Sequence, residues 1–300
     1  MRKIIMFLTI FIFGFTCSVF SADDSAEFYK QVETWHERRI NSLKSETGWL
    51  SLAGLYWLKQ GPNAFGSAKD NDIIFPEDTP KYMGTVSLQD SIVTINVNAD
   101  VSIMNDSVQV TQMQLVNDNN ENPTYLSHDK YTWYIIKRQD KYGIRLKNRE
   151  HPRLKNFTDI ERYPVDIKWR IKARLQEYNP PKEIKVSNVL GQVEELPCPG
   201  ALVFEIDGQL YSIDPFSTSD GKRYWIIFGD ATNEIETYGA GRYLYIDAVD
   251  ENGETYIDFN QCYNPPCAFT PYSTCTLPPR QNVLKIKVTA GEKSWQGSNH

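Results

Sequence analysis

The repeating pattern of short apolar runs is the strongest constraint on how this chain can fold. From Trp49 onward, runs rich in Val, Ile, Tyr and Trp are separated by Gly, Asn, Asp and Pro. Turn residues at about every eight to twelve positions predict β-strands joined by tight turns. Residues 165–175 alternate strictly between apolar and polar side chains, which predicts a strand with one buried face. The pattern therefore predicts a sandwich or a barrel.

Three pairs of predicted strands are separated by sequences typical of hairpin turns. The pairs are 131–138 with 143–147, 201–206 with 209–213, and 243–249 with 254–259. In the second pair, the turn is Asp207-Gly208, a dipeptide that suits a tight turn with positive φ. We therefore expect neighbouring strands in the chain to pair with each other.

One amphipathic helix is predicted before the strands. Apolar side chains recur at helical spacing between Phe28 and Leu43. Asp24 and Glu27 have the spacing of a capping box, in which Asp24 precedes the first turn. The helix is therefore expected over about Ser25–Ser45.

Local composition predicts where the parts of the chain begin and end. A charged, proline-containing stretch near residues 151–159 separates two β-rich halves. We predict a mainly β fold with an N-terminal helix followed by two β-rich domains of the sandwich or barrel type. The predicted parts are a signal peptide (1–21), the helical segment (22–46), a sandwich-like domain (47–155), a second β-rich domain (156–293) and a tail (294–300).

The first 21 residues have the composition of a secretory signal peptide. Two basic residues precede an apolar run over residues 4–15, and small residues lead to a cleavage site near Ser21 or Ala22. The run is shorter than the roughly twenty apolar residues that an uncleaved membrane anchor needs. The residues before Cys17 form a poor lipidation motif, so we expect no lipoprotein. We expect an exported protein, periplasmic or secreted, with no stable membrane span after signal cleavage.

The charge balance bears on the partners. The chain has 32 Lys and Arg residues against 38 Asp and Glu residues, a net charge of −6. An acidic chain has no broad attraction to nucleic acid or anionic lipid, so we expect no nucleic-acid partner. No sequence pattern indicates an oligomeric state.

Two polar loops near the C-terminus carry the densest motifs. Residues 228–242 place Asp, Glu, Tyr and Arg side chains between two predicted strands. Residues 258–282 contain five prolines among Asn, Thr and Tyr, which is typical of a rigid loop.

These loops resemble a family known only as domain of unknown function 1684. The motifs that carry the resemblance are Glu236–Arg242, Asp258–Asn260, Tyr263–Phe269, Cys275–Asn282 and Ala290–Glu292, with Gly48–Leu55 upstream. The resemblance spans nearly the whole mature chain, and it implies no particular activity. Two positions depart from the family pattern: Glu234 stands where Gly is usual, and Cys262 where a small residue is usual.

Four cysteines follow the predicted signal peptide: Cys198, Cys262, Cys267 and Cys275. Four thiols in an oxidising compartment allow three full pairings. The departure at Cys262 leaves Cys267 and Cys275 as a pair, and their spacing of eight residues lets the loop fold back on itself. We therefore predict a disulfide between these two residues. A metal site and a catalytic thiol are alternatives, but the spacing is not a strong zinc signature and no His lies nearby.

The polar residues of the motifs are the candidate ligand contacts. We predict a small-molecule or glycan site formed by Asp230, Glu236, Tyr238, Arg242, Asp258, Asn260, Tyr263 and Asn264. Aromatic side chains could wall such a pocket, and the candidates are Tyr238, Tyr243, Tyr245, Tyr263, Phe269 and Tyr272. A purely structural alternative pairs Arg242 with Asp258 or Glu236 to hold the loops together.

No enzyme class is indicated. There is no recognisable nucleophile–base pair, phosphate-binding loop or dinucleotide fingerprint, and we expect no cofactor and no metal. A hydrolase that uses a carboxylate pair from Asp230, Glu236 and Asp258 is one alternative function. A disulfide-clamped structural scaffold is another.

The N-terminal half resembles a forkhead-associated β-sandwich. The resemblance rests on Gly66-Ser67, Asn71–Pro76, Gly84 and Asn105-Asp106. Phosphothreonine readers with this fold need an Arg after the first Gly, where this chain has Ser67. The resemblance therefore implies a sandwich scaffold without phosphopeptide binding.

Overall fold

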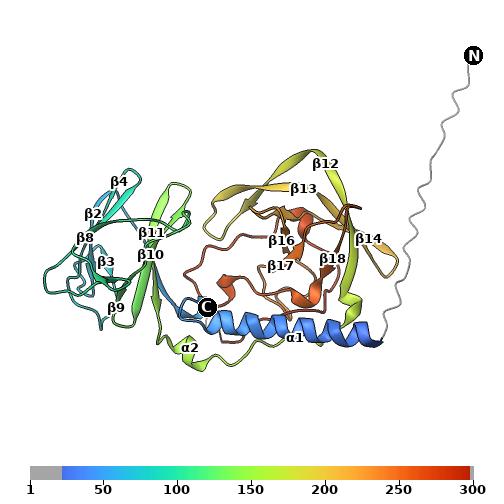
Figure 1. Ribbon diagram of the computed structural model, residues 1–300, viewed down its shortest axis with the longest axis horizontal. Helices are drawn as coiled ribbons and strands as arrows, with labels where there is room; N and C mark the ends of the chain where they lie inside the picture. The colour runs from blue at the N-terminus through green and yellow to red at the C-terminus, as the bar shows by residue number, and fades with distance from the viewer. Residues whose placement is uncertain (1–21, 298–300) are drawn as a thin grey trace, which may run out of the picture.

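The computed structural model describes residues 22–297. One long helix comes first in the chain, and most of the regular structure that follows is β-strand (Figure 1). The predicted signal peptide, residues 1–21, lies outside the described residues, as do the last three residues of the predicted tail. The described strands form sheets of six, five, four and three strands. The predicted fold class, mainly β with an N-terminal helix, is confirmed.

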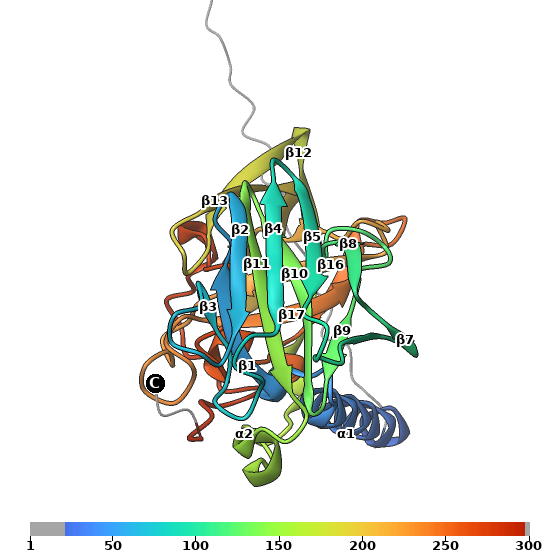
Figure 2. The ribbon, with the colours of Figure 1, turned by 90° about the vertical axis from the view of Figure 1, so that its left-hand side faces the viewer.

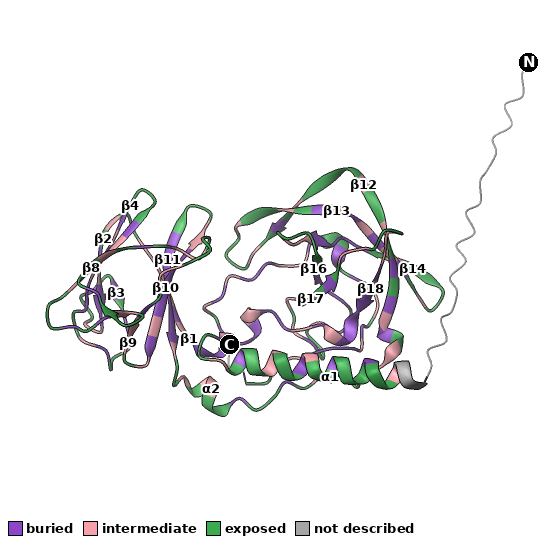
Figure 3. Cartoon of the chain, viewed as in Figure 1, coloured by how far each residue is buried: buried purple, intermediate pink, exposed green. Residues whose placement is uncertain are grey.

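Helix α1 (Ala22–Lys44) runs beneath the C-terminal strands (Figure 1). Its buried apolar residues include Phe28, Val32 and Leu43, while most of its outer side is exposed (Figure 3). The helix packs against two short 3-10 helices, η1 (Trp49–Ser51) and η3 (Phe259–Gln261). It therefore joins segments that are more than two hundred residues apart in the chain.

The start of α1 differs from the prediction. The helix already includes Ala22, three residues before the predicted Ser25, and Asp24 lies inside it. Asp24 is therefore not the residue that precedes the first turn, and the predicted capping box is wrong.

The N-terminal strands form a sandwich of two sheets (Figure 2). The six-stranded sheet has the order β1-β11-β10-β9-β6-β7, with β1 Leu52–Trp57, β6 Met104–Asn105, β7 Val108–Gln109, β9 Leu126–His128, β10 Tyr131–Arg138 and β11 Lys141–Asn148. The five-stranded sheet has the order β3-β2-β4-β5-β8, with β2 Gly61–Gly66, β3 Ile73–Ile74, β4 Gly84–Gln89, β5 Ile92–Val97 and β8 Gln112–Leu115. Phe65, Phe75 and Trp133 pack edge-to-face between the two sheets. We call β1–β11 the N-terminal sandwich.

The C-terminal strands form two further sheets around a second core. The four-stranded sheet has the order β14-β13-β12-β18, with β12 Arg170–Ser187, β13 Val193–Ile206, β14 Gln209–Ile213 and β18 Glu254–Asp258. The three-stranded sheet has the order β15-β16-β17, with β15 Phe216–Ser217, β16 Arg223–Phe228 and β17 Arg242–Asp247. Phe204, Phe228 and Phe259 are fully buried in this core. We call β12–β18 the C-terminal sheets.

Two of the three predicted hairpins are present. Strands β10 and β11 pair antiparallel, and so do β13 and β14. In the second hairpin, Asp207 and Gly208 have φ values of 50° and 78°, as a two-residue turn between twisted strands requires. The third prediction is wrong, because β17 pairs with β16 while β18 pairs with β12.

The alternating run at residues 165–175 is only partly a strand. Residues Ile167–Trp169 form a 3-10 helix, η2, and Asp166 caps it by accepting a hydrogen bond from the Lys168 amide at 3.0 Å. Strand β12 begins at Arg170 and keeps the predicted alternation, with Ile171 and Ala173 buried. It then continues to Ser187 as a long arm with β13, which the sequence did not predict.

The remaining elements are short helices, and one of them lies between the two halves of the chain. Helix α2 (Pro152–Asn156) starts after His151, whose ring accepts a hydrogen bond from the Arg153 amide. The other short helices are η4 (Pro266–Ala268) and η5 (Arg280–Asn282) in the proline-rich loop. Within residues 22–297, no helix has the length and apolar character needed to cross a membrane.

Candidate functional site

Arg242, at the start of β17, lies at the centre of the family motifs. Its guanidinium donates to Asp230 Oδ2 at 2.8 Å and to the carbonyl oxygens of Val288 and Ala290. Asp230 Oδ1 accepts hydrogen bonds from the amide and hydroxyl of Thr232, at 2.8 and 2.6 Å. The sequence-based pairing of Arg242 with Asp258 or Glu236 is wrong, since the partner is Asp230. This pair fastens the C-terminal segment to β17.

A second buried ion pair attaches α1 to the motif loops. Glu292 accepts a hydrogen bond from Arg39 Nε at 3.1 Å and from the Asn264 amide at 2.7 Å. Arg39 also donates to the Asn264 carbonyl oxygen at 2.9 Å, and its guanidinium lies 4.7 Å from the centroid of the Tyr263 ring. Arg39 was not among the predicted site residues, because its helical spacing indicated only a position in the amphipathic helix.

Asp258 and Asn260 stabilise the turn after β18. Asp258 Oδ1 accepts hydrogen bonds from the amide and side chain of Asn260, which in turn bridges the backbone of Asp166. Burial raises the pKa of the Asp258 carboxyl above its ordinary value. Asp258 also lines a cavity of about 690 Å³ that contains Lys172 and Glu254.

The remaining predicted contacts lie elsewhere. The Glu236 side chain is exposed, and its backbone carbonyl accepts a hydrogen bond from the Ser294 amide. Tyr238 is half-buried against the core that contains Phe269, and burial raises its pKa to about 12. The predicted residues therefore fall into separate groups. In most of them the polar atoms bond to protein partners.

Aromatic side chains line a groove of about 480 Å³ between α1 and the C-terminal sheets. We call it the aromatic groove, and its rings are Trp35, Trp49, Trp225, Tyr243, Tyr245 and Tyr263. Trp225 and Tyr245 face each other across β16 and β17, and their rings stack at 6.3 Å with an interplanar angle of 18°. Tyr263 continues the stack, 6.4 Å from Tyr245 at 17°. Three of the six rings, Tyr243, Tyr245 and Tyr263, were among the predicted wall residues.

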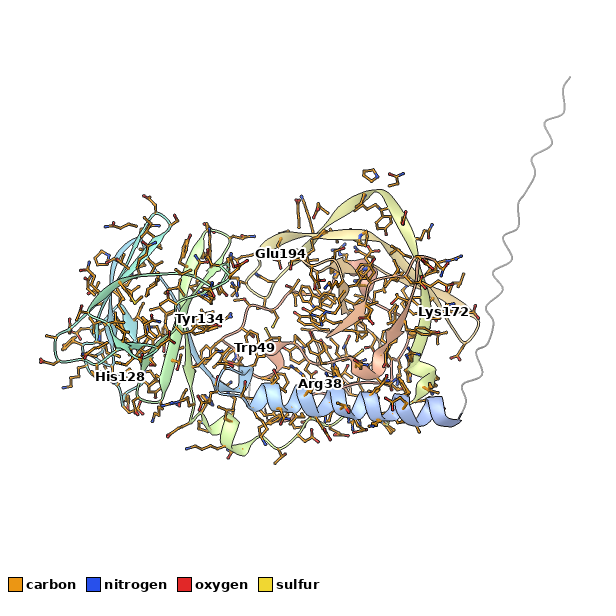
Figure 4. The ribbon with its side chains drawn as sticks, in the orientation of Figure 1. Arg38, Trp49, His128, Tyr134, Lys172 and Glu194 are labelled. Carbon is orange, nitrogen blue, oxygen red and sulfur yellow. The ribbon has the colours of Figure 1, made fainter. Side chains whose placement is uncertain are left out.

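Local geometry explains why these rings reach the groove. Ile226 and Leu244 point into the core, so their neighbours Trp225 and Tyr245 point to the opposite face of the sheet. Arg223 lies over the Tyr245 ring at 5.2 Å. On the helix side, Arg38 and Ser42 are exposed and line the groove (Figure 4 shows Arg38 on α1).

A second cavity, of about 340 Å³, lies between the N-terminal sandwich and the C-terminal sheets. We call it the interface cavity. Its lining residues include Arg138 and Arg145 from the sandwich, Glu194 from β13, and Cys275 from the proline-rich loop (Figure 4 labels Glu194). The two cavities have four lining residues in common: Trp49, Trp225, Tyr243 and Pro266. The aromatic groove therefore adjoins the interface cavity.

The family match covers the part of the chain that forms most of these walls. Residues 155–293 match the family described as "Protein of unknown function (DUF1684)". Residues 155–293 of this chain are thus similar to DUF1684. The match begins after the N-terminal sandwich and ends just before the described C-terminus, so it contains Arg242, Asp230 and the proline-rich loop. The resemblance noted in the sequence is thereby confirmed for these residues.

Two solved structures show distant likenesses to parts of the chain. An uncharacterized protein of Haloarcula marismortui, solved by NMR, is 24% identical to this chain, with a TM-score of 0.40 over 48% of this chain and 80% of that one. A crystal structure of the FhaA FHA domain, complexed with the intracellular domain of Rv3910, matches at 12% identity. Its TM-score is 0.21 over 31% of this chain and 97% of that one. No curated protein matches the chain.

Residues 155–293 hold all four cysteines that follow the predicted signal peptide. The structure has them as free thiols, so it does not contain the predicted disulfide between Cys267 and Cys275. Cys198 and Cys262 are completely buried. Cys267 and Cys275 are neighbours, since the Cys267 amide donates to Cys275 Sγ at 3.0 Å. The hydrogen bond with Cys275 lowers the pKa of the Cys267 thiol, and burial raises that of Cys275.

One of the two departures from the DUF1684 pattern has a visible consequence. Glu234, where Gly is usual, has a φ of 65°, which is in the left-handed region that favours glycine.

Within the described residues, no group of three or more His, Cys, Asp or Glu side chains is arranged to hold a metal ion.

Proposed function

We propose that this protein is an exported binding protein that takes a small molecule or glycan in the aromatic groove. The observation that carries the proposal is the stack of Trp225, Tyr245 and Tyr263. Two of these nearly parallel rings come from strands and Tyr263 from a loop. Together they form an apolar platform, and Tyr245 keeps 42% of its surface exposed there. Such a platform suits a sugar ring or another flat ligand.

Polar side chains beside the platform could orient a bound ligand through hydrogen bonds. Arg38 and Ser42 line one side of the groove from α1. Within residues 22–297, Arg38 donates one side-chain hydrogen bond, from Nε to the Thr34 carbonyl oxygen, and the Ser42 hydroxyl has no hydrogen-bond partner. A mostly apolar pocket with few convergent polar groups is the usual form of a small-molecule site. Tyr263 is the predicted contact that this proposal retains.

Binding measurements with a panel of glycans and small metabolites test the proposal. Each hit is then measured again with one pair of matched variants. Removing a stacking ring by Tyr245→Ala should weaken binding of every hit by about tenfold, because a stacked ring contributes about 1 kcal/mol or more. The control is Tyr82→Ala, which removes a ring that is 52% exposed on the N-terminal sandwich. Equal affinity in both variants, or no ligand in the panel, would contradict the proposal.

Export is part of the proposal and has its own test. The supporting pattern is the basic, apolar and small-residue order of residues 1–21. In a secreting bacterial host, the protein should reach the periplasm or medium, and its N-terminus should begin near Ala22. An intact N-terminus in the cytosolic fraction would contradict this part.

A carboxylate hydrolase is the alternative, and one observation favours it. Asp258 has a raised pKa, and it lines its cavity together with three other acidic residues, Asp247, Asp250 and Glu254. Asp230 does not fit this role, because its carboxylate is bound to Arg242. A bell-shaped pH–rate profile that Asp258→Asn abolishes would support hydrolysis. Absence of turnover on glycoside and ester panels would count against it.

A further inference from the structure

Arg145 is a buried arginine at the boundary between the N-terminal sandwich and the C-terminal sheets. Its strand neighbours Ile144 and Leu146 point into the sandwich core. Because side chains alternate along a strand, Arg145 points to the other face of the sheet, where it lines the interface cavity. Only 2% of its surface is exposed.

The charge of Arg145 helps to lower the pKa of the Cys267 thiol, but it has no carboxylate partner among the described residues. Among residues 22–297, no carboxylate lies within ion-pair distance of its guanidinium. Its one hydrogen bond is long, from Nη1 to Tyr134 Oη at 3.5 Å. Nε and Nη2 are buried, and neither has a hydrogen-bond partner in the part of the chain that the structure describes. A buried charge without a partner is costly, so a residue of this kind points to a missing anion.

A second cation makes the same region more positive. Lys147, two residues further along β11, is also buried, and its ammonium donates to the Thr47 carbonyl oxygen. Burial and the charge of Arg145 lower the pKa of Lys147 to about 8. No ion pair within the described residues neutralises either side chain.

The other charged residues of the interface cavity are satisfied, in contrast to Arg145. Arg138 forms two hydrogen bonds with the Asp118 carboxylate and a third with Thr274. Glu194 accepts a hydrogen bond from the Thr276 hydroxyl at 3.1 Å. Arg145 is therefore the cation lining this cavity whose buried Nε and Nη2 lack a hydrogen-bond partner among the described residues.

The two free nitrogens of Arg145 also define the shape of that ligand. Nε–H and the outer N–H of Nη2 lie side by side on one edge of the planar guanidinium. This edge donates two parallel hydrogen bonds to a group with two acceptor oxygens, as a carboxylate or a phosphate has. Trp49, whose ring lies 5.5 Å from the guanidinium, covers the site.

We propose that Arg145 anchors an oxyanion site in the interface cavity, which takes the carboxylate or phosphate group of a small-molecule ligand. The site does not depend on the aromatic groove, although the two share the wall formed by Trp49 and Trp225. A ligand that filled both would be an acidic molecule with a flat or sugar-like body. Trp49 and Trp225 line the cavity, so an oxyanion bound at the guanidinium should change the tryptophan fluorescence.

The test measures thermal unfolding and tryptophan fluorescence of the purified chain in sodium acetate, sodium phosphate and sodium chloride at equal ionic strength. At about ten times its Kd, the bound oxyanion should raise Tm by about 3 °C over chloride. Comparing acetate with phosphate distinguishes a carboxylate site from a phosphate site. No rise and no fluorescence change with either anion would overturn the proposal.

Variants separate the site from general salt effects. Arg145→Met should abolish the oxyanion-specific rise, and in chloride its Tm should exceed that of the wild type, because an unpaired buried charge is gone. Arg145→Lys keeps the charge without the two-nitrogen edge and should bind at least tenfold more weakly. The control Arg149→Met removes an exposed arginine just after β11 and should respond like the wild type. An unchanged rise in Arg145→Met would overturn the proposal.

Discussion

Arg242 and Asp230 form an ion pair at 2.8 Å in which both side chains are fully excluded from solvent. Arg242 also donates hydrogen bonds to the carbonyl oxygens of Val288 and Ala290, and Asp230 accepts one from the Val288 amide. The pair therefore connects β17 to the C-terminal end of the chain. This geometry gives the most prominent charged residues of the family motifs a structural role. It also explains why the candidate binding surface is formed mainly by aromatic side chains.

Breaking the Arg242–Asp230 pair should strongly destabilise the protein. Asp230→Asn removes the negative charge and leaves a buried guanidinium without a counter-charge, which costs about 3–5 kcal/mol. Urea unfolding measures the change in the free energy of unfolding. Lys185→Met is the control, because it breaks an exposed pair with Glu195 and should change stability by less than about 1 kcal/mol. Equal small effects would contradict the structural role of Asp230.

Arg39 should be needed to hold α1 against the C-terminal sheets. Arg39→Met leaves the Glu292 carboxylate, which is almost completely buried, without its cation, and we expect a loss of about 3 kcal/mol. Hydrogen exchange should show faster exchange of the α1 amides than in the wild type. The neighbouring residue gives a matched control, since Arg38→Met removes an exposed side chain and should leave α1 protected.

Local sequence signals predicted the elements whose partners are adjacent in the chain. The hairpins of β10 with β11 and β13 with β14 depend on a tight turn, and Asp207-Gly208 carries the required backbone conformation in its residue types. The third hairpin failed for a physical reason. Its two strands pair along their whole length with other strands, β17 with β16 and β18 with β12, so neither has this edge left for the other.

The site was harder to predict than the strands. Tyr243, Tyr245 and Tyr263 were foreseen as wall residues, yet the stack needs Tyr263 from a loop to lie beside two strands, and no local pattern encodes that placement. The missing partner of Arg145 is likewise a property of the folded chain. In the sequence, Arg145 is one polar residue in an alternating strand.

Glu234→Gly should stabilise the protein. Glu234 has a φ of 65°, which costs a residue with a side chain about 1 kcal/mol or more, and glycine adopts this conformation freely. Part of the gain is lost through the greater entropy of glycine in the unfolded chain, so we expect a net increase of about 0.5–1 kcal/mol in the free energy of unfolding. The control Glu251→Gly lies in an exposed turn without positive φ and should destabilise slightly. A loss of stability in Glu234→Gly would contradict this account.

Lys147 should make stability rise with pH in the alkaline range. Its pKa is about 8 in the folded protein against an ordinary value of 10.5, so between these values the unfolded chain binds more protons. The contribution of Lys147 to the free energy of unfolding therefore increases from about pH 8 to 10.5, by at most about 3 kcal/mol.

Comparison with Lys147→Met isolates this contribution from the titration of tyrosines and cysteines. The variant should be more stable than the wild type at pH 7, and the difference should shrink as the pH rises towards 10.5. Urea unfolding at several pH values measures the difference. The control Lys141→Met removes an exposed lysine at the start of β11 and should show a constant difference. A constant difference for Lys147→Met would mean that its pKa is not lowered.

Cys267 and Cys275 should form a disulfide when the protein is made in an oxidising compartment. The hydrogen bond between the Cys267 amide and Cys275 Sγ holds the two residues side by side, and the lowered pKa of Cys267 favours the thiolate that attacks a donor disulfide. Oxidation removes two hydrogens, so the unreduced mass should be about 2 Da below the sum for free thiols, and dithiothreitol should restore it.

The disulfide also decides whether the motif is a clamped scaffold. Closing a loop of eight residues should contribute about 2–3 kcal/mol, so the double variant Cys267→Ser with Cys275→Ser should lose that much stability under oxidising conditions. In the presence of reductant, the wild type and the double variant should be nearly equal. Cys198→Ala is the control, because Cys198 is buried and contacts the Gly200 carbonyl rather than a second thiol. It should leave the mass difference between unreduced and reduced protein unchanged. An unreduced mass equal to the reduced mass would refute the pairing, and unchanged stability in the double variant would remove the scaffold function.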